Sequence, residues 1–186
     1  MTDYQALFAA VTRDPHYKRN LDWGEPRRGH PEGTVRAHIA ELERNLERLA
    51  DRVSGDDYWK LKVLIHTHDT FKPDSAGEGA VPISHPRSHA SLARAFLARF
   101  TDDQDLLAMT QLHDEPFALW NQRRSRGTYN RERFRRLLDS IRDWDLFARF
   151  LIIDGCTEGK SREPLRWFLR EIAGNVHTTV GPGDML

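Results

Sequence analysis

Apolar residues recur at steps of three and four along almost the whole chain, and this period constrains the fold more than any other feature. The longest stripe runs from Val35 to Val53, with Pro31 just inside its start and Gly55 at its end. No segment of strand length alternates apolar and polar residues. The sequence therefore predicts an all-α protein, a single-domain helical bundle. Shorter helical stripes cover 58–70, 92–97, 106–112, 134–141, 146–151 and 165–172, and Phe8 and Val11 indicate a short leading helix.

The length of 186 residues suits one domain, since domains commonly hold ~100–200 residues. We divide the chain into an N-terminal helix and lead-in (1–28), a main helical domain (29–173) and an aperiodic C-terminal tail (174–186) that we expect to fray. The segment 72–86 is rich in Pro, Gly and Ser, and the segment 121–128 is basic, so both are predicted to be loops.

The charges exclude several kinds of partner. Lys and Arg number 28, as do Asp and Glu, so the formal net charge is zero and bulk charge attracts neither nucleic acid nor an anionic membrane. The longest apolar run, Leu7 to Val11, is too short for a membrane span or a signal peptide. One cysteine, Cys156, excludes an internal disulfide and fits the reducing cytoplasm. No heptad seam indicates an oligomeric state.

Histidine is the informative residue, because six of the nine lie between His38 and His113. His38, for example, is three residues after Val35 and four before Leu42, so its side chain is predicted to point inward with theirs. Asp69 directly follows His68, which is predicted to point inward in the same way. His66 lies on the other side of the helix that carries His68 and is interpreted as structural. Inward-pointing residues on five separate predicted helices are His38, His68, His85, His89, His113 and Asp154.

A buried charge is costly unless it is paired, neutralised or bound to a metal ion. One such residue alone would be interpreted as a hydrogen-bonded core histidine. Five helices that each turn a titratable group inward are most simply satisfied by one shared centre. Imidazole nitrogens and carboxylate oxygens suit Mn, Fe, Co, Ni or Zn better than Ca, and the absence of thiolates argues against a structural zinc site. The pattern therefore predicts a metal centre.

The pair His68-Asp69 in the segment LIHTHDTFK, with His38 upstream and Asp154 far downstream, resembles the HD-domain superfamily of metal-dependent phosphohydrolases. Further segments resemble that family in the same order along the chain. The resemblance extends from residue 29 to residue 162 and implies an HD-type helical fold for 29–173. The further segments are GHPEGTVRAHI (29–39), HPRSHASLARAFL (85–97), LLAMTQLHDEPF (106–117) and LIIDGCTEGKSR (151–162).

The resemblance implies a centre of one or two divalent transition metal ions. Two ions ~3.5–4 Å apart can share a hydroxide of lowered pKa, which attacks phosphorus. Asp69 is the natural bridge because it has two oxygens. The implied ligands are His38, His68, Asp69 and Asp154 for the first ion, and Asp69, His113 and either His85 or His89 for the second, with His85 favoured over His89.

The activity implied is hydrolysis of a phosphate ester or anhydride in a nucleotide or another small phosphorylated metabolite. Asp69 and Lys72 are the catalytic candidates, and Lys72 would bind a phosphoryl oxygen or support the bridging water. Residues 73–84 could form a lid over the site. Other basic residues that could meet a substrate phosphate are Arg27, Arg28, Arg87, Lys160 and Arg162.

Two other functions remain open at this point. The resemblance extends to HD-fold di-iron oxygenases, whose ligands are similarly rich in histidine. A non-catalytic nucleotide-sensing domain could also keep this fold, although such a sensor has no need to retain all four of His38, His68, Asp69 and Asp154.

Overall fold

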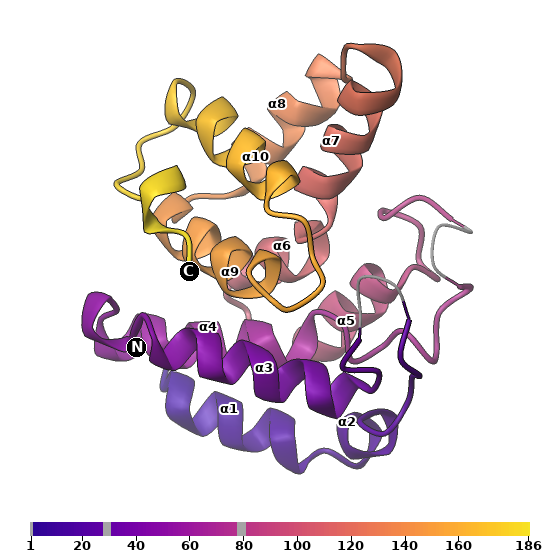
Figure 1. Cartoon of the computed structure of the whole chain (residues 1–186). Coiled ribbons are helices and arrows are strands. Elements are labelled where there is room, and N and C mark those ends of the chain that lie inside the picture. The colour runs from indigo at the N-terminus through magenta and orange to yellow at the C-terminus, as the bar shows by residue number, and fades with distance from the viewer. Residues whose placement is uncertain (1, 28–30, 78–80) are drawn as a thin grey trace.

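Helices are the regular elements throughout residues 2–27, 31–77 and 81–186, which the computed structural model describes (Figure 1). No β-strand occurs in these ranges, so the all-α prediction is confirmed. The elements are α1 (Tyr4–Arg13), α2 (Pro15–Asn20), α3 (Val35–Glu47), η1 (Ala50–Arg52), α4 (Gly55–Thr67), α5 (His89–Leu97), α6 (Gln104–Leu112), α7 (Glu115–Arg126), α8 (Arg131–Ser140), α9 (Trp144–Gly155), α10 (Glu163–Ala173) and η2 (Pro182–Asp184), where η denotes a short 3₁₀ helix.

Side-chain caps determine where most of these helices begin. The hydroxyl of Thr34 accepts a hydrogen bond from the Ala37 N–H at the start of α3, at 3.2 Å. The hydroxyl of Ser88 accepts one from the Ser91 N–H at the start of α5, at 3.1 Å. Such bonds satisfy backbone donors that have no partner within the helix. These caps also determine which residues lie at the helix ends, and most of the polar side chains of the candidate site lie there.

The central element is α4, which packs against α1, α3, α5, α6 and α9. The helices α1, α3 and α4 form one side of the molecule, and α7, α8 and α10 form the opposite side (Figure 1). Between the two sides runs α9, which contacts α3, α4 and α10. As a result, the C-terminal end of α9 is brought next to α3, which comes more than a hundred residues earlier in the chain.

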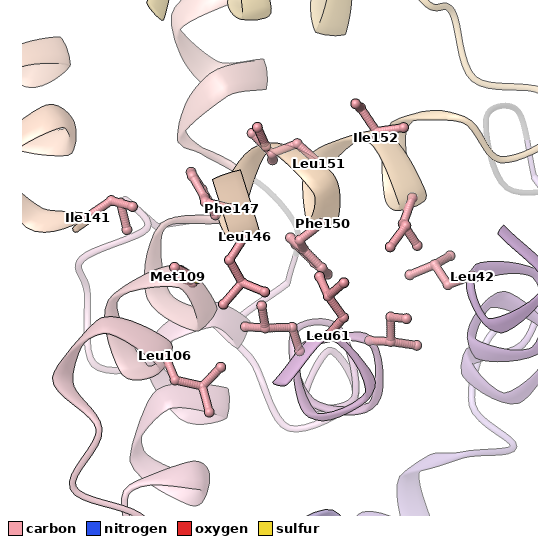
Figure 2. Packing of buried hydrophobic residues seen from close by; sticks show 14 of the residues in the cluster. Leu42, Leu61, Leu106, Met109, Ile141, Leu146, Phe147, Phe150, Leu151 and Ile152 are labelled. Carbon is pink, nitrogen blue, oxygen red and sulfur yellow. The ribbon is translucent and has the colours of Figure 1, made fainter. Parts of the chain in front are cut away.

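The hydrophobic core lies where α3, α4, α6 and α9 meet. Phe147 and Phe150 of α9 are completely buried, and Figure 2 shows Phe150 directed toward Leu61 of α4. Leu42 of α3 and Met109 of α6 are also completely buried in this cluster. Burying each such side chain stabilises the fold by about 1.5–3 kcal/mol relative to leaving it in water. The four helices are therefore held rigidly relative to one another.

Several predicted helix boundaries differ from the observed ones. The cap at Thr34 places the start of α3 at Val35 rather than near Pro31. That helix ends at Glu47, and Gly55 begins α4 instead of ending the preceding helix. The basic segment predicted as a loop from 121 is helical as far as Arg126.

The C-terminal residues pack against α9 and do not fray as expected. The Asp145 carboxylate accepts hydrogen bonds from the Thr178 hydroxyl and from the Thr179 N–H, both at 2.7 Å. Val180 is buried in the core cluster. Aperiodic sequence alone could not reveal this contact, because Asp145 supplies it from another element. None of the described helices is both long and apolar enough to cross a membrane.

Candidate metal centre

Ends of helices bring six titratable side chains together, and we name them the His/Asp cluster. His68 and His113 each occupy the residue immediately after a helix, and His89 is the first residue of α5. The remaining members lie in the early part of α3, in the turn after α4 and in the last turn of α9. The members are His38, His68, Asp69, His89, His113 and Asp154.

Three of these residues, His38, His68 and Asp69, form the first group. One ligand atom from each lies within 4.8 Å of the others. The Oδ2 atom of Asp69 is 3.5 Å from His68 Nε2 and 3.8 Å from His38 Nε2. All three residues are buried. This group could hold a metal ion.

Asp154 lies at the edge of the first group. Its Oδ1 atom is 3.2 Å from His38 Nε2 and 3.9 Å from His68 Nε2. The same oxygen accepts a hydrogen bond from the Lys160 ammonium at 2.7 Å. Asp154 is thus within reach of both histidines of the first group, so the predicted ligands of a first ion come together from α3, the end of α4 and α9.

The second group consists of Asp69, His89 and His113. The Oδ1 atom of Asp69 is 3.5 Å from the Nε2 atom of each histidine, and the two Nε2 atoms are 3.2 Å apart. Asp69 therefore belongs to both groups and presents a different oxygen to each. This group also has ligand atoms close enough together to hold a metal ion.

Backbone carbonyls set the orientation of two histidine rings. The Nδ1 atom of His68 is 3.1 Å from the carbonyl oxygens of Leu64 and Ile65, and that of His113 is 2.9 Å from the carbonyl oxygen of Thr110. A carbonyl oxygen only accepts, so Nδ1 carries the proton and donates it. In a neutral ring Nε2 then presents a lone pair. For His68 that nitrogen is buried, lacks a hydrogen-bond partner and faces carboxylate oxygens, so a cation between them suits the arrangement.

The electrostatics keep His68, Asp69 and Asp154 in the protonation states that suit metal binding. Burial lowers the pKa of His68 to about 3, although Asp69 acts to raise it. Burial opposes ionisation of Asp69, but neighbouring positive charge, led by the Lys72 ammonium at 2.5 Å, holds its pKa well below the usual range. Lys160 acts in the same way on the pKa of Asp154, again against burial. Neutral imidazoles and ionised carboxylates are the forms that coordinate metals.

Two other histidines of the cluster gain positive charge from acidic neighbours. Burial alone would lower the pKa of His38, but Asp154 and Glu32 raise it to about 9. Burial would likewise lower the pKa of His113, which Asp114 and Asp69 raise to about 9. The carboxylates around these rings therefore attract positive charge, and a metal ion would supply it in place of the protons.

His85 does not join the cluster, so the prediction that it points inward was wrong, and of the two histidines His89 is the one that lies at the cluster. It is exposed, and its Nδ1 atom accepts a hydrogen bond from the Arg87 N–H at 3.1 Å. The physical reason is the Ser88 cap: α5 starts at His89, so His85 is in the preceding turn and does not share its helical face. Arg87, expected to bind substrate, is exposed in the same turn.

Arg162, also expected to bind substrate, is engaged with backbone carbonyls instead. Its guanidinium donates hydrogen bonds to backbone carbonyls at the end of α9, at 2.9 Å to Gly155 and 2.7 Å to Cys156, and it bonds Thr157 and Lys160 in the same way. These contacts satisfy carbonyls left without partners at a helix C-terminus. Arg162 is thus engaged with the backbone, whereas Lys160 lies at the cluster.

His66 lies outside the cluster, as its structural interpretation requires. Its Nδ1 atom is 2.5 Å from the Tyr17 hydroxyl, and its Nε2 atom is 3.0 Å from Glu43 Oε1. Glu43 also accepts a hydrogen bond from Lys62. These contacts join α2, α3 and α4 on the far side of α4 from His68.

A small hollow opens beside the first group. It is lined by the cationic side chains of Arg27 and Lys72, by the carboxylates of Glu32 and Asp69, and by His38 and Trp23. Trp23 is 40% exposed, which is unusual for so large an apolar residue. Arg28, the other basic residue expected here, lies outside the described residues.

Three residues of the site were not found from the sequence. Glu32 approaches His38, with 2.8 Å between Glu32 Oε1 and His38 Nδ1, and Asp114 approaches His89, with 3.2 Å between Asp114 Oδ2 and His89 Nε2. Glu32 and Trp23 precede α3 in a segment without periodicity, so no pattern marks them. Asp114 carried a signal, because it follows His113 just as Asp69 follows His68.

Comparisons of the chain with protein-family models, with curated proteins and with solved structures find no significant match.

Proposed function

We propose that this chain is a metal-dependent phosphohydrolase that cleaves a phosphate ester or anhydride bond of a nucleotide or another small phosphorylated metabolite. The observation that carries the proposal is the position of Asp69, whose Oδ2 lies near His38 and His68 and whose Oδ1 lies near His89 and His113. A carboxylate shared by two donor groups suits a pair of adjacent cations, the arrangement used in many phosphoryl-transfer sites.

The cluster residues would hold one or two divalent transition metal ions. When bound, such ions supply Lewis acidity and a water of lowered pKa. His38, His68, Asp69 and Asp154 would hold the first ion, and Asp69, His89 and His113 would hold the second. Nitrogen and carboxylate donors accommodate Mn, Fe, Co, Ni or Zn.

The lining of the hollow supports a phosphorylated substrate. Lys72 and Arg27 provide positive charge beside the cluster, where a phosphoryl group would be neutralised. Lys72 is 2.5 Å from Asp69, so it can contact both the shared carboxylate and a phosphoryl oxygen held next to it. Trp23 offers a flat apolar surface on which a nucleobase can stack. The charges and the flat ring beside the hollow therefore favour a phosphorylated, ring-containing substrate over an uncharged metabolite.

The test is a phosphate-release screen over nucleotides and simple phosphate esters, using chelator-stripped protein reloaded with Mn, Co, Ni, Fe or Mg. We expect metal-dependent release for at least one nucleotide and none with the stripped protein. Asp69→Ala should abolish release while leaving the helical circular dichroism spectrum unchanged. Asp139→Ala, an exposed position on α8, is the matched control and should keep full activity.

Other outcomes would contradict the proposal and identify what replaces it. Oxygen consumption that depends on substrate, with iron-loaded protein and without phosphate release, would identify an oxygenase. Saturable nucleotide binding that is equal in the wild type and Asp69→Ala, without turnover, would identify a sensor.

A further inference from the structure

We infer that Asp114 is a ligand in the second group, which would make that group a metal site of two histidines and two carboxylates. The inference rests on the metal centre of the proposed function but not on its reaction. It concerns a residue that the chain places at the site from the turn between α6 and α7.

The position of the Asp114 carboxylate is the first argument. Its Oδ2 atom is 3.2 Å from His89 Nε2 and 3.7 Å from His113 Nε2. The same two nitrogens are each 3.5 Å from Asp69 Oδ1. The pair of imidazoles therefore faces a carboxylate oxygen from each of two acidic residues. Four nitrogen and oxygen donors match the number that Zn and similar ions take from protein side chains.

The Asp114 carboxylate is not occupied in capping the following helix. Asp114 is the residue before α7, where an aspartate normally accepts a hydrogen bond from the first turn of the helix. Asp3, Asp14, Asp103 and Asp143 all do so at their own helices. The Asp114 side chain makes no such bond. Its backbone is helical, with φ −87° and ψ −8°, whereas Asp3, Asp14 and Asp103 are extended, so the Asp114 carboxylate does not cap α7 and lies against the histidine pair.

Local geometry at the end of α6 repeats that at the end of α4. In each case a histidine follows the helix and hydrogen-bonds a carbonyl of the last turn through Nδ1, and an aspartate comes next. The Nε2 to Oδ2 distance within the pair is 3.5 Å for His68 and Asp69 and 3.7 Å for His113 and Asp114. The same local conformation that presents Asp69 to the first group therefore presents Asp114 to the second.

Solvent exposure distinguishes the two groups. The Asp114 side chain is 49% exposed, compared with 11% for Asp69 and 1% for His68. An ion held partly by Asp114 would lie on the open side of the cluster and exchange with solvent more readily than an ion in the first group. We therefore expect two binding events of unequal affinity, the weaker of which depends on Asp114.

The experiment is a titration of chelator-stripped protein with Co²⁺, followed by calorimetry and by the visible absorption of the bound ion. Wild-type protein should bind two ions. Asp114→Asn should weaken the second event at least tenfold and change its absorption spectrum, while the first event keeps its affinity. Asp143→Asn is the matched control, because it alters a capping aspartate away from the cluster, and both events should be unchanged.

A second variant guards against a folding defect. Asp114→Ser keeps a residue that caps helices well but removes the carboxylate, so it should weaken the second event as Asp114→Asn does. Thermal unfolding of the stripped proteins checks that both variants are folded. If both variants bind two ions with the affinities and spectra of the wild type, the inference about Asp114 is wrong and the proposed function is unaffected. One event in the wild type would overturn the inference too, but would leave a one-ion hydrolase. No binding at all would overturn the proposed function as well.

Discussion

Glu32 faces His38 across 2.8 Å, with its Oε1 atom at the Nδ1 atom of the ring, while Nε2 of the same ring faces Asp69 and Asp154. The side chains of both residues are at least nine-tenths buried. A carboxylate in this position fixes the orientation of a ligating histidine and increases its basicity.

We therefore predict that Glu32→Gln weakens binding of the first ion by about 10–100-fold, the range seen when such a supporting residue is changed. Glu25→Gln, at an exposed position in the same segment, is the control and should bind like the wild type. Calorimetric titration with Mn²⁺ or Co²⁺ measures both. Equal affinities for Glu32→Gln and wild type would show that this contact does not support a ligand.

His89 and His85 form a matched pair of substitutions four residues apart. His89→Ala removes a nitrogen that lies 3.5 Å from Asp69, so we predict loss of one bound ion per chain. His85→Ala alters an exposed residue outside the cluster and should leave the metal content unchanged. Elemental analysis of protein purified under identical metal loading gives the comparison. If His85→Ala lost the ion and His89→Ala kept it, the turn before α5 would have to rearrange to bring His85 to the metal.

Trp23 should determine how well the site accepts an aromatic substrate. If a nucleobase stacks on it, Trp23→Ala should raise KM for a nucleotide about 5- to 150-fold, since stacking contributes about 1–3 kcal/mol per base. The KM for a phosphate ester without a ring should change little. Phe117→Ala, on α7 and 55% exposed, is the control. A uniform rise in KM for both substrates would argue against stacking.

The contact between Glu43 and His66 makes a prediction about acid stability. Hydrogen bonds from His66 and Lys62 lower the pKa of Glu43 from 4.5 to about 2, against the effect of burial. The stabilisation is therefore complete above pH 4.5 and is lost as the pH falls toward 2. Because the side chain is one-third exposed, we expect a contribution on the order of 1–2 kcal/mol after solvent screening.

Urea unfolding at about pH 5 and at about pH 2.5 tests this prediction. The free energy of unfolding should fall less over that interval in Glu43→Gln than in the wild type. Glu132→Gln changes an exposed carboxylate paired only along α8 and should keep the wild-type difference. An unchanged difference in Glu43→Gln would assign the acid sensitivity to other groups.

Periodicity in the sequence was enough to predict the helical class and to select several residues of the cluster. His38, His113 and Asp154 lie on or just beyond helices with a clear apolar stripe, so their inward direction followed from helical geometry. Asp69 could be found only through its neighbour His68, because it lies in the turn after α4.

Residues outside regular helices could not be placed in this way. His85 was misjudged because the helical period was continued past the Ser88 cap, where the backbone turns away. Glu32 and Trp23 depend on how the segment before α3 is folded back against it, which no spacing along the chain records. Arg162 has the charge expected of a phosphate ligand, but the carbonyls at the end of α9 take up its guanidinium.

The packing of His68 has a consequence for the abundance of the protein. Its ring lies edge-on to Phe150, with 5.2 Å between the ring centroids, so the His/Asp cluster is in direct contact with the hydrophobic core. An ion bound by residues of α3, α4 and α9 would cross-link distant parts of the chain. Because the ion would bind only the native state, it would raise the free energy of unfolding by mass action. Cells starved of the metal would then hold less of the protein, since unfolded chains are removed by proteolysis.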